Sequence, residues 1–250
     1  MKLHRFILDI KLAKGQVVVD DADVVRQMSA VLKLKVGEAV VLSDGQGNDA
    51  KGEIIKLDKR QVAIDLDAPR VCHNKPVRNV TLFCAILKRE NFEWVVQKAT
   101  EIGVAKIVPI ITERTVKQAL KMERLRSIAK EAAEQSGRCR VPDIAEPTKL
   151  SEALVSSKNQ STYFFHTSPA SVSDLPTFRP SDNMLSIYVG PEGGWTDNEV
   201  RLAKDFGCKT ASLGKLVLRG ETAAVCASFW AVGVGSSWVP EIGHQGVVGL

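Results

Sequence analysis

The first part of the chain alternates apolar and polar side chains in short stretches that turn signals separate. The stretches are "HRFIL", "GQVVVD", "AVVLSDGQGNDAKGEIIKL" and "QVAIDLD", and this alternation is typical of half-buried β-strands. The glycines of "DGQGND" suit a tight hairpin. One segment, "DADVVRQMSAVLKLKVGE", instead predicts a short helix capped by Asp21 or Asp23. We therefore expect a small, mostly β barrel at residues 1–72.

The pattern changes near "VCHNKPVRNV", which predicts a linker at residues 70–78 and a second domain over residues 76–235. Five apolar stretches predict parallel strands: "VTLFCAIL", "AKIVPIIT", "STYFFHT", "MLSIYVG" and "CKTASLG". Helical periodicity marks "ENFEWVVQKATEIG", which stops at Gly103, then "MERLRSIAKEAAEQSG" and finally "ETAAVCASFWAVGVG". Apolar strands between helices indicate an α/β sheet covered on both faces. We expect residues 236–250 to form a loose tail.

The composition, 44% hydrophobic and 25% charged, is ordinary for a soluble globular protein. No apolar run approaches the roughly 20 residues of a membrane span. The start, "MKLHRFILDIKL", is too short and too charged for a signal peptide, so we expect a cytoplasmic protein with no membrane partner. The five cysteines form no CxxC pair and the four histidines are scattered, which predicts buried free thiols and neither a disulfide nor a metal site.

Positive charge is concentrated in the middle of the chain, where residues 88–140 hold 12 lysines and arginines against 7 acidic residues. A basic surface of this kind suits a polyanion such as RNA. The alternative is that these helices simply carry solvated lysines.

Three of the predicted strands end in unusual residues, in the segments "FFHTSPA" (164–170), "YVGPEGG" (188–194) and "LGKLVLRGETA" (213–223). Ligands of open α/β sheets bind beyond the carboxyl ends of the strands. We therefore expect the three segments to form one pocket.

The segment "GPEGG" matches neither GxGxxG nor GxxxxGK[ST], and Glu192 within it would repel a phosphate. Its glycines let the backbone approach a ligand closely, which favours a phosphate-free, neutral or cationic ligand such as S-adenosylmethionine. The structural alternative is a turn before the helix "TDNEVRLAKDFG", with Thr196 as cap and Glu199 completing a capping box.

The segment "LVLRGETAA" places a charged pair where an apolar run meets the last helix. Glu221 in the first turn complements the helix dipole, which is a sufficient structural reason for it, and Thr222 is a candidate cap. Arg219 has no such reason. It suits a nearby acid, a phosphate or charge that develops on a substrate oxygen.

Five segments in order resemble a known family. They are "HRF" (4–6), "KRENFEWVVQKATEIGV" (88–104), "EAAEQSGR" (131–138), "GPEGG" (190–194) and "LGKLVLRGETAA" (213–224). Together they are similar to the ribosomal RNA small subunit methyltransferase E family of the SPOUT superfamily, which methylates N3 of a uridine in bacterial 16S rRNA. Each motif alone is weak, but the ordered set is specific and covers the chain to about residue 235.

The resemblance implies a PUA-like β-barrel that helps to hold RNA, followed by an α/β methyltransferase domain with a deep trefoil knot. It also implies a homodimer and an S-adenosylmethionine site in the knot, with no metal. The cofactor residues that it implies are His166, Thr167, Val189, Gly190, Pro191, Glu192, Gly193, Gly194, Leu213, Gly214, Leu218, Arg219, Glu221, Thr222 and Ala223.

The chain departs from the family pattern in three places. Gly220 stands where the family often has threonine, which predicts a more flexible loop. Trp195 stands where a smaller residue is usual, and the tail "WVPEIGHQGVVGL" has no counterpart.

For the reaction, the residues predict two catalytic candidates, Arg219 and Glu221. Arg219 would stabilise the negative charge on uridine O2 or O4 as the N3 proton leaves. Glu221 is a candidate base, although its role at the helix terminus or proton transfer to bulk water are equal alternatives.

The target base would be flipped out of small-subunit rRNA, within the 30S subunit. The expected RNA contacts are Arg5, Lys88, Arg89, Arg114 and Arg138. The rival hypotheses are a non-enzymatic RNA-binding or ribosome-assembly module and a knotted methyltransferase of tRNA. A nicotinamide oxidoreductase is disfavoured because the chain lacks a GxGxxG turn.

Overall fold

The computed structural model describes residues 3–72, 76, 78–116, 119–158, 160–167 and 183–233. By its internal contacts the chain divides into two compact units, and neither is continuous in sequence. Unit 1 comprises residues 1–75, 88–107 and 119–146, and unit 2 comprises residues 76–87, 108–118 and 147–250. The first transition, at residue 75, lies within the predicted linker. The two continuous domains remain a prediction, since unit 1 also takes in two later stretches.

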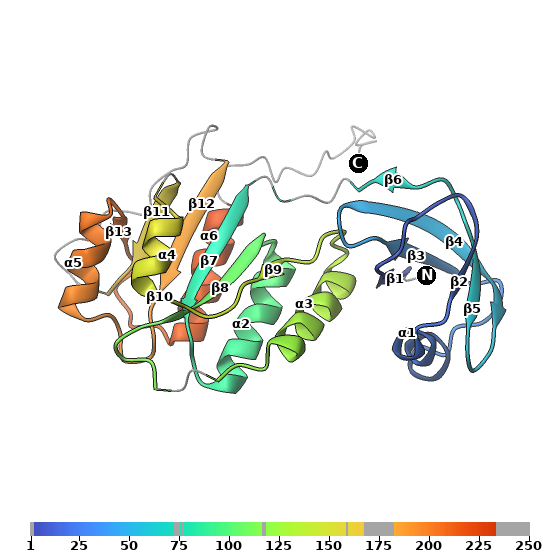
Figure 1. Cartoon of the computed structure of the whole chain (residues 1–250), viewed down its shortest axis with the longest axis horizontal. Helices are drawn as coiled ribbons and strands as arrows, with labels where there is room; N and C mark the ends of the chain where they lie inside the picture. Colours follow the sequence, from blue (N-terminus) through green and yellow to red (C-terminus); the bar gives the residue numbers. More distant parts are fainter. Residues whose placement is uncertain are drawn as a thin grey trace, which may run out of the picture. The chain divides into compact units, whose positions relative to one another are not determined.

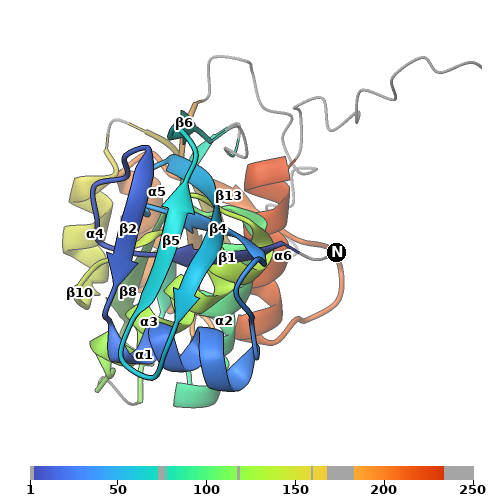
Figure 2. The same cartoon turned by 90° about the vertical axis from the view of Figure 1, so that its right-hand side faces the viewer.

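Unit 1 contains a six-stranded sheet in the order β1-β3-β4-β5-β2, with β6 paired to β4. Its strands are β1 (His4–Ile7), β2 (Gly15–Val19), β3 (Ala39–Ser43), β4 (Asn48–Leu57), β5 (Val62–Leu66) and β6 (Arg70–Val71). β1 and β3 run parallel, and the other described pairs are antiparallel. β2, β5 and β4 lie side by side in Figure 2. The predicted hairpin joins β3 to β4, where Gly45 and Gly47 have φ values of 68° and 116°.

Unit 1 also contains three helices whose ends follow the sequence signals. The Asp21 side chain accepts hydrogen bonds from two N–H groups of α1 (Ala22–Arg26), and the chain continues in a π-helical turn, η1 (Gln27–Val31). α2 (Arg89–Ile102) ends at Gly103 in the left-handed conformation, as predicted. α3 (Met122–Ser136) packs against α2.

The motif "EAAEQSGR" at the end of α3 has an internal role in unit 1. The buried Glu134 side chain accepts a hydrogen bond of 2.8 Å from the Ile7 N–H of β1. Burial raises the pKa of this carboxyl above its ordinary value, and the Ile7 N–H opposes that rise. The motif therefore ties α3 to β1 of the six-stranded sheet.

A second sheet of seven strands has the order β10-β8-β7-β12-β11-β13, with β9 paired to β8. The strands are β7 (Asn79–Ala85), β8 (Lys106–Ile111), β9 (Asp143–Ile144), β10 (Thr148–Lys149), β11 (Ser161–Phe165), β12 (Met184–Val189) and β13 (Lys209–Ala211). Every pair with a described register is parallel. β7, β12 and β11 lie side by side in Figure 1. All five predicted parallel strands are present, so the α/β fold class is confirmed.

Three helices belong to unit 2: α4 (Leu150–Ser156), α5 (Asp197–Asp205) and α6 (Gly220–Gly233). α6 packs against β7 and β12 and lies behind them in Figure 1. α5 begins with the predicted capping box, in which Thr196 and Glu199 each accept a hydrogen bond from the other's backbone N–H. The short elements α4, β6, β9 and β10 were not predicted, and residues 236–250 lie outside the described part.

Two cysteines of unit 1 correct a prediction. Cys72 and Cys139 form a disulfide with a Cα–Cα distance of 6.2 Å, although buried free thiols were expected. They lie 67 positions apart. They meet only because the segment after α3 returns to the segment after β6, so the spacing of the cysteines along the chain did not predict the disulfide. Cys84 and Cys208 are buried free thiols, as predicted, whereas Cys226 is free and exposed.

The buried Asp49 lies beside this disulfide, close enough for Asp49, Cys72 and Cys139 to hold a metal ion by distance alone. Its two carboxylate oxygens, however, take the guanidinium groups of Arg5 at 3.2 Å and Arg70 at 3.0 Å. Both carboxylate oxygens of Asp49, which a metal ion would need as ligands, are therefore already paired with arginines. Within the described residues, no helix has the length and apolar character that crossing a membrane requires.

Candidate active site

Two hydrogen bonds bring three strand ends of unit 2 together. The Trp195 indole N–H, from the loop after β12, donates to the Phe165 carbonyl at the end of β11 at 2.8 Å. The next residue, His166, donates its backbone N–H to the Ala211 carbonyl at the end of β13 at 2.9 Å. The carboxyl ends of β11, β12 and β13 thus meet at one edge of the sheet, as predicted.

The start of α6 lies against Leu87 after β7 and Gly190 after β12. A Cβ on Gly220 would lie 2.9 Å from Leu87 Cδ2 and 3.5 Å from the Gly190 carbonyl oxygen. Only glycine therefore fits here without displacement. The departure from threonine at this position accompanies close packing, and not the loose loop that the sequence suggested.

The "GPEGG" segment is a tight turn in which glycines are required for packing and backbone conformation. The Gly194 N–H donates to the Pro191 carbonyl at 2.8 Å, and Gly194 has a φ of 70°. A Cβ on Gly190 would lie 2.9 Å from Trp195 Cε2. The structural alternative, a turn leading into the capping box of α5, is therefore correct for this segment, and it is compatible with a binding role.

Two carboxylates lie near the carboxyl end of β7. Burial raises the pKa of the Cys84 thiol strongly, and the charges of Glu192 and Glu221 raise it further. Within the described residues, Glu221 Oε2 is a buried atom with no hydrogen-bond partner. Since buried polar atoms are nearly always paired, Glu221 offers an acceptor to a ligand, beyond its place in the first turn of α6.

Arg219 directly precedes α6 and is exposed. Its carbonyl accepts the Ala223 N–H at 2.8 Å, whereas its guanidinium makes no hydrogen bond or ion pair with any residue that the structure describes. Thr222 is the third residue of α6 and so does not act as its N-cap, which corrects that expectation.

The other expected cofactor residues line the same edge. Val189 is the buried last residue of β12, and Gly214, with φ 130°, lies in a turn that the Ser212 hydroxyl closes through Gly214 N at 3.2 Å and Gly214 O at 3.0 Å. The remaining members vary in exposure: Thr167, Glu192 and Gly193 are exposed, Pro191 is buried, and Leu213, Leu218, Thr222 and Ala223 are half-buried.

The His166 imidazole is half-buried, and its pKa is lowered from the ordinary value. Desolvation is the main cause, the charge of Lys204 adds to it, and Asp197 opposes it. The side chain therefore favours its neutral form.

The expected RNA contacts divide into two groups. Arg138 is buried, and its guanidinium donates to the carbonyls of Thr100 at 2.6 Å and Val104 at 3.0 Å, while burial lowers its pKa to about 10. Arg5 is ion-paired with Asp49, and only 13% of its side chain is exposed. Neither guanidinium is placed to meet RNA, so the geometry gives these two assignments no support.

The other three expected contacts are exposed. Lys88 is the N-cap of α2, and Arg89 forms an ion pair with Glu93 at 3.1 Å. Arg114 donates to the carbonyl oxygens of Gly193 and Trp195 at the candidate site. The structure therefore assigns Arg114 a contact that its basic character did not predict.

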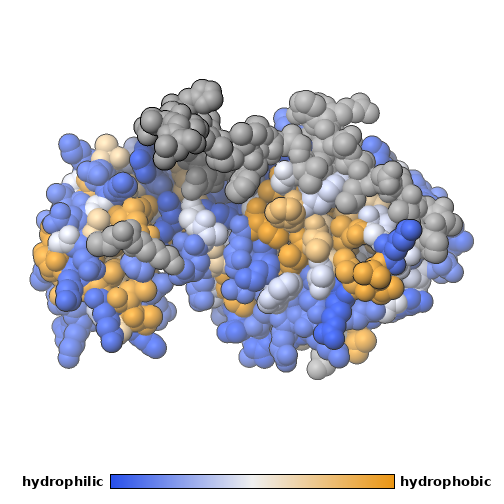
Figure 3. Space-filling view, turned by 180° about the vertical axis from the view of Figure 1, so that it is seen from behind, coloured by the Kyte–Doolittle hydropathy of each residue, from blue (hydrophilic) through white to orange (hydrophobic). Residues whose placement is uncertain are grey.

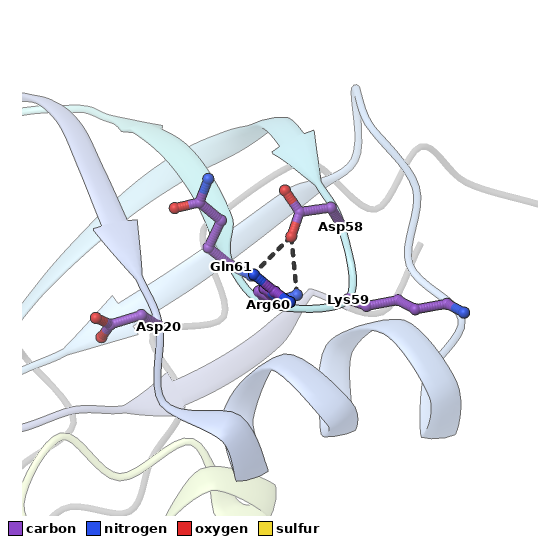
Figure 4. A pocket seen from close by; sticks show the side chains of 5 residues that line it. All are labelled: Asp20, Asp58, Lys59, Arg60 and Gln61. Carbon is purple, nitrogen blue, oxygen red and sulfur yellow. Dashed lines mark hydrogen bonds between the residues drawn. The ribbon is translucent and has the colours of Figure 1, made fainter.

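A further cavity, of about 560 Å³, lies in unit 1 and was not predicted (Figure 4). The turn between β4 and β5 forms one wall, where Asp58 Oδ1 accepts the N–H groups of Arg60 at 2.8 Å and Gln61 at 2.9 Å. Lys59 and Arg60 also line an adjoining cavity of about 420 Å³ with Arg26. The adjacent basic pair in "LDKRQ" was the available sequence signal.

The chain matches family models along most of its length. A model described as an RNA methyltransferase domain matches residues 73–231, and one described as an RNA methyltransferase PUA domain matches residues 29–67. Ribosomal RNA small subunit methyltransferase E of Rickettsia conorii is 30% identical over 232 residues, which cover 91% of this chain and 94% of that protein. The Bacillus subtilis protein of the same name is 28% identical and covers 79% of this chain and 82% of its own length.

Two solved structures share the fold over nearly the whole chain. The Neisseria gonorrhoeae ribosomal RNA small subunit methyltransferase E, bound to S-adenosylmethionine, has a TM-score of 0.84 at 31% identity and covers 91% of this chain and 95% of its own. A methyltransferase of Legionella pneumophila with bound S-adenosylmethionine has a TM-score of 0.84 at 29% identity, covering 92% and 98%. With both the domain models and the whole-length relatives in agreement, the chain belongs to the ribosomal RNA small subunit methyltransferase E family of RNA methyltransferases.

Proposed function

We propose that the protein transfers a methyl group from S-adenosylmethionine to N3 of a uridine in small-subunit ribosomal RNA. The observation that carries this is the edge of the unit 2 sheet, where glycine-containing strand ends meet Glu221 and the exposed Arg219. Among the residues that the structure describes, the buried Glu221 Oε2 and the Arg219 guanidinium have no partner. Two relatives of the same fold hold S-adenosylmethionine. The family resemblance adds the uridine N3 specificity and the trefoil knot, which are parts of this proposal.

The cofactor site is proposed at the turn 190–194, with residues 166–167 and 213–223 as its other walls. This edge offers backbone groups at glycines and two nearby carboxylates, Glu192 and Glu221. A sulfonium and an ammonium are attracted by such carboxylates, whereas a phosphate is repelled. When bound, S-adenosylmethionine supplies an electrophilic methyl group.

Arg219 and Glu221 are proposed to act on the uracil. The exposed guanidinium of Arg219 would donate to O2 or O4, and it would stabilise the negative charge that develops there as N3 loses its proton. The unpaired Glu221 Oε2 is an acceptor for the N3 proton or for a donor group of the ligand. Both residues flank Gly220, where an added Cβ would lie 2.9 Å from Leu87 Cδ2.

RNA binding is proposed to use the exposed basic side chains. They are Lys88 and Arg89 of the original set, together with Arg26, Lys59 and Arg60 around the two cavities of unit 1. The PUA-domain match covers part of this unit. Phosphate contacts of this kind position an RNA without reading its sequence. The substrate is proposed to be rRNA within the 30S subunit, in the cytoplasm.

A homodimer is proposed through α6. This helix exposes 65% of Phe229, and Leu216 and Val217 just before it are 81% and 85% exposed. Figure 3 shows apolar side chains gathered over this face of unit 2. An exposed apolar patch on α6 and the segment before it suits a self-complementary interface between two copies of the chain.

The decisive experiment maps methylated uridines in rRNA from a strain that lacks the protein, with and without re-expression. We expect one N3-methyluridine of the small subunit to be lost and then restored. Loss of a tRNA methylation instead would favour the tRNA enzyme. Calorimetry with S-adenosylmethionine addresses the remaining rival, because a pure RNA-binding or assembly module would release no heat.

The roles at the site are tested with Arg219→Ala against Arg201→Ala. Arg201 is an exposed arginine of α5 that hydrogen-bonds Asn198 at 2.8 Å. We expect Arg219→Ala to keep the fold and near-normal cofactor affinity but to lower kcat by about 100-fold or more, typical of losing one oxyanion donor. Equal kcat in both variants would remove Arg219 from the mechanism.

A further inference from the structure

We infer that Arg114 is a positioning residue of the cofactor turn 190–194, and not a contact to RNA. The inference rests on the proposed function, because it assigns a second layer of residues to the proposed S-adenosylmethionine site. Arg114 follows β8, so it comes from a strand that contributes none of the three segments identified from the sequence.

The Arg114 side chain lies along the turn. A Cβ on Gly193 would lie 3.3 Å from Arg114 Cδ, 3.6 Å from its Cβ and 3.9 Å from its Cγ. The aliphatic part of Arg114 thus packs over Gly193, and its guanidinium Nη1 donates to the Gly193 carbonyl at 2.5 Å and to the Trp195 carbonyl at 3.4 Å. These bonds direct the carbonyls of Gly193 and Trp195 toward the loop after β8.

Glu113, the residue before Arg114, joins the loop after β8 to α5. The Glu113 N–H donates to Glu199 Oε1 at 2.9 Å, while Glu199 Oε2 accepts the Thr196 N–H at 2.8 Å. Glu199 is 5% exposed, so its carboxylate bridges the two segments away from solvent. One carboxylate therefore joins the capping box of α5 to the loop after β8.

Hydrogen bonds between Thr112 and Thr115 close the loop after β8 into a turn. The Thr112 N–H donates to the Thr115 hydroxyl at 3.0 Å, the two hydroxyls lie 2.8 Å apart, and the Thr115 N–H returns to the Thr112 carbonyl at 3.2 Å. A turn closed by three hydrogen bonds holds the Arg114 backbone between them in one conformation.

The opposite side of the turn is held by Trp195. Its ring packs against Phe164 with centroids 4.2 Å apart and an interplanar angle of 31°, and its indole N–H donates to the Phe165 carbonyl. The cofactor turn is therefore held between β11 on one side and the loop after β8 on the other. Arg114 is the exposed member of this support, and it can be changed without opening a buried cavity.

The test measures S-adenosylmethionine affinity by calorimetry for the wild type, Arg114→Gln, Arg114→Lys and the control Arg201→Gln. We expect Arg114→Gln to raise the Kd about tenfold, the usual scale for losing hydrogen bonds from a charged donor. Arg114→Lys keeps a charged donor and should recover part of the loss, while Arg201→Gln should match the wild type. The KM for the cofactor should follow the Kd, with kcat less affected.

Binding to a small-subunit rRNA fragment at several salt concentrations separates the two roles. A positioning residue leaves RNA affinity and its salt dependence unchanged, whereas a phosphate contact weakens binding and lowers the salt slope by about one. The inference is overturned if folded Arg114→Gln binds S-adenosylmethionine like the wild type, or if it loses only RNA affinity. A wild-type protein that binds no S-adenosylmethionine refutes the proposed function itself, which is a different outcome. Should Arg114→Gln fail to fold, the Arg114→Lys Kd decides in its place.

Discussion

Replacing Gly190 with alanine should lower the stability of the protein and weaken cofactor binding at the proposed site. The new Cβ would lie 2.9 Å from Cε2, 3.0 Å from Nε1 and 3.2 Å from Cδ2 of the Trp195 ring. The ring cannot move away at low cost, because Trp195 is 5% exposed, its ring packs against Phe164 and its indole N–H donates to the Phe165 carbonyl. Either the turn or the indole must shift.

The size of the effect follows from this packing. Forcing one extra carbon into a close-packed site costs about 1–3 kcal/mol, and loss of the indole hydrogen bond would add about 1 kcal/mol. A change of about 2 kcal/mol lowers the Tm of a chain of this size by about 4–8 °C. Because the same shift moves the turn 190–194, where the cofactor site is proposed, the Kd for S-adenosylmethionine should rise about tenfold or more.

The assay is thermal unfolding and calorimetry of Gly190→Ala, with Gly233→Ala as the matched control. Gly233 ends α6, and a Cβ there meets no atom within 4 Å, so the control should keep its Tm and affinity. Adding Trp195→Ala to Gly190→Ala removes the whole indole ring that the new Cβ would meet. The double variant should then lose less stability than the sum of the two single changes. A Gly190→Ala protein with the Tm and Kd of the wild type would show that the packing argument is mistaken.

Three further predictions concern other parts of the molecule. The pKa of His166 is lowered in the folded protein, so the unfolded state takes up a proton first as the pH falls below about 6.5. The free energy of unfolding, measured by denaturant titration at each pH, should therefore fall from pH 7 to pH 5, and it should fall less in His166→Gln. Reducing the Cys72–Cys139 disulfide, which spans 67 positions, should lower the free energy of unfolding by about 2–4 kcal/mol, and Cys72→Ser should abolish this sensitivity to reductant; an equal response in both proteins would contradict it. Phe229→Asp should convert a dimer to a monomer in light scattering, because it places a charge on the exposed apolar face of α6, and an unchanged mass would reject that interface.

The regular elements could be predicted because their signals are local. Apolar runs gave the parallel strands of unit 2, and Asp21, Gly103 and Thr196 marked helix ends through the backbone groups that they satisfy or the conformations that they allow. The site edge followed from one topological rule, that parallel strands end together. Fold and site edge were therefore accessible from the sequence.

The roles of the basic residues were not accessible, because burial and partners are tertiary properties. Arg138, Arg114 and Arg5 are equally basic in the sequence, yet one is buried against carbonyls, one supports a turn and one pairs with Asp49. The distribution of charge along the chain predicts an electrostatic potential, but it does not predict which atoms each basic side chain contacts. The Cys72–Cys139 disulfide was missed for the same reason.

The hydrogen bond between Glu134 and the Ile7 N–H bears on how the protein can be cut into pieces. A fragment of residues 1–72 would retain all six strands of the first sheet, but it would lose the carboxylate that satisfies an edge strand and the helix α3 that packs on β1. An unpaired buried N–H and an uncovered apolar flank both favour aggregation. Recombinant versions of unit 1 should therefore carry α2 and α3 with the six-stranded sheet, and grafts that swap the sheet alone between relatives should express poorly.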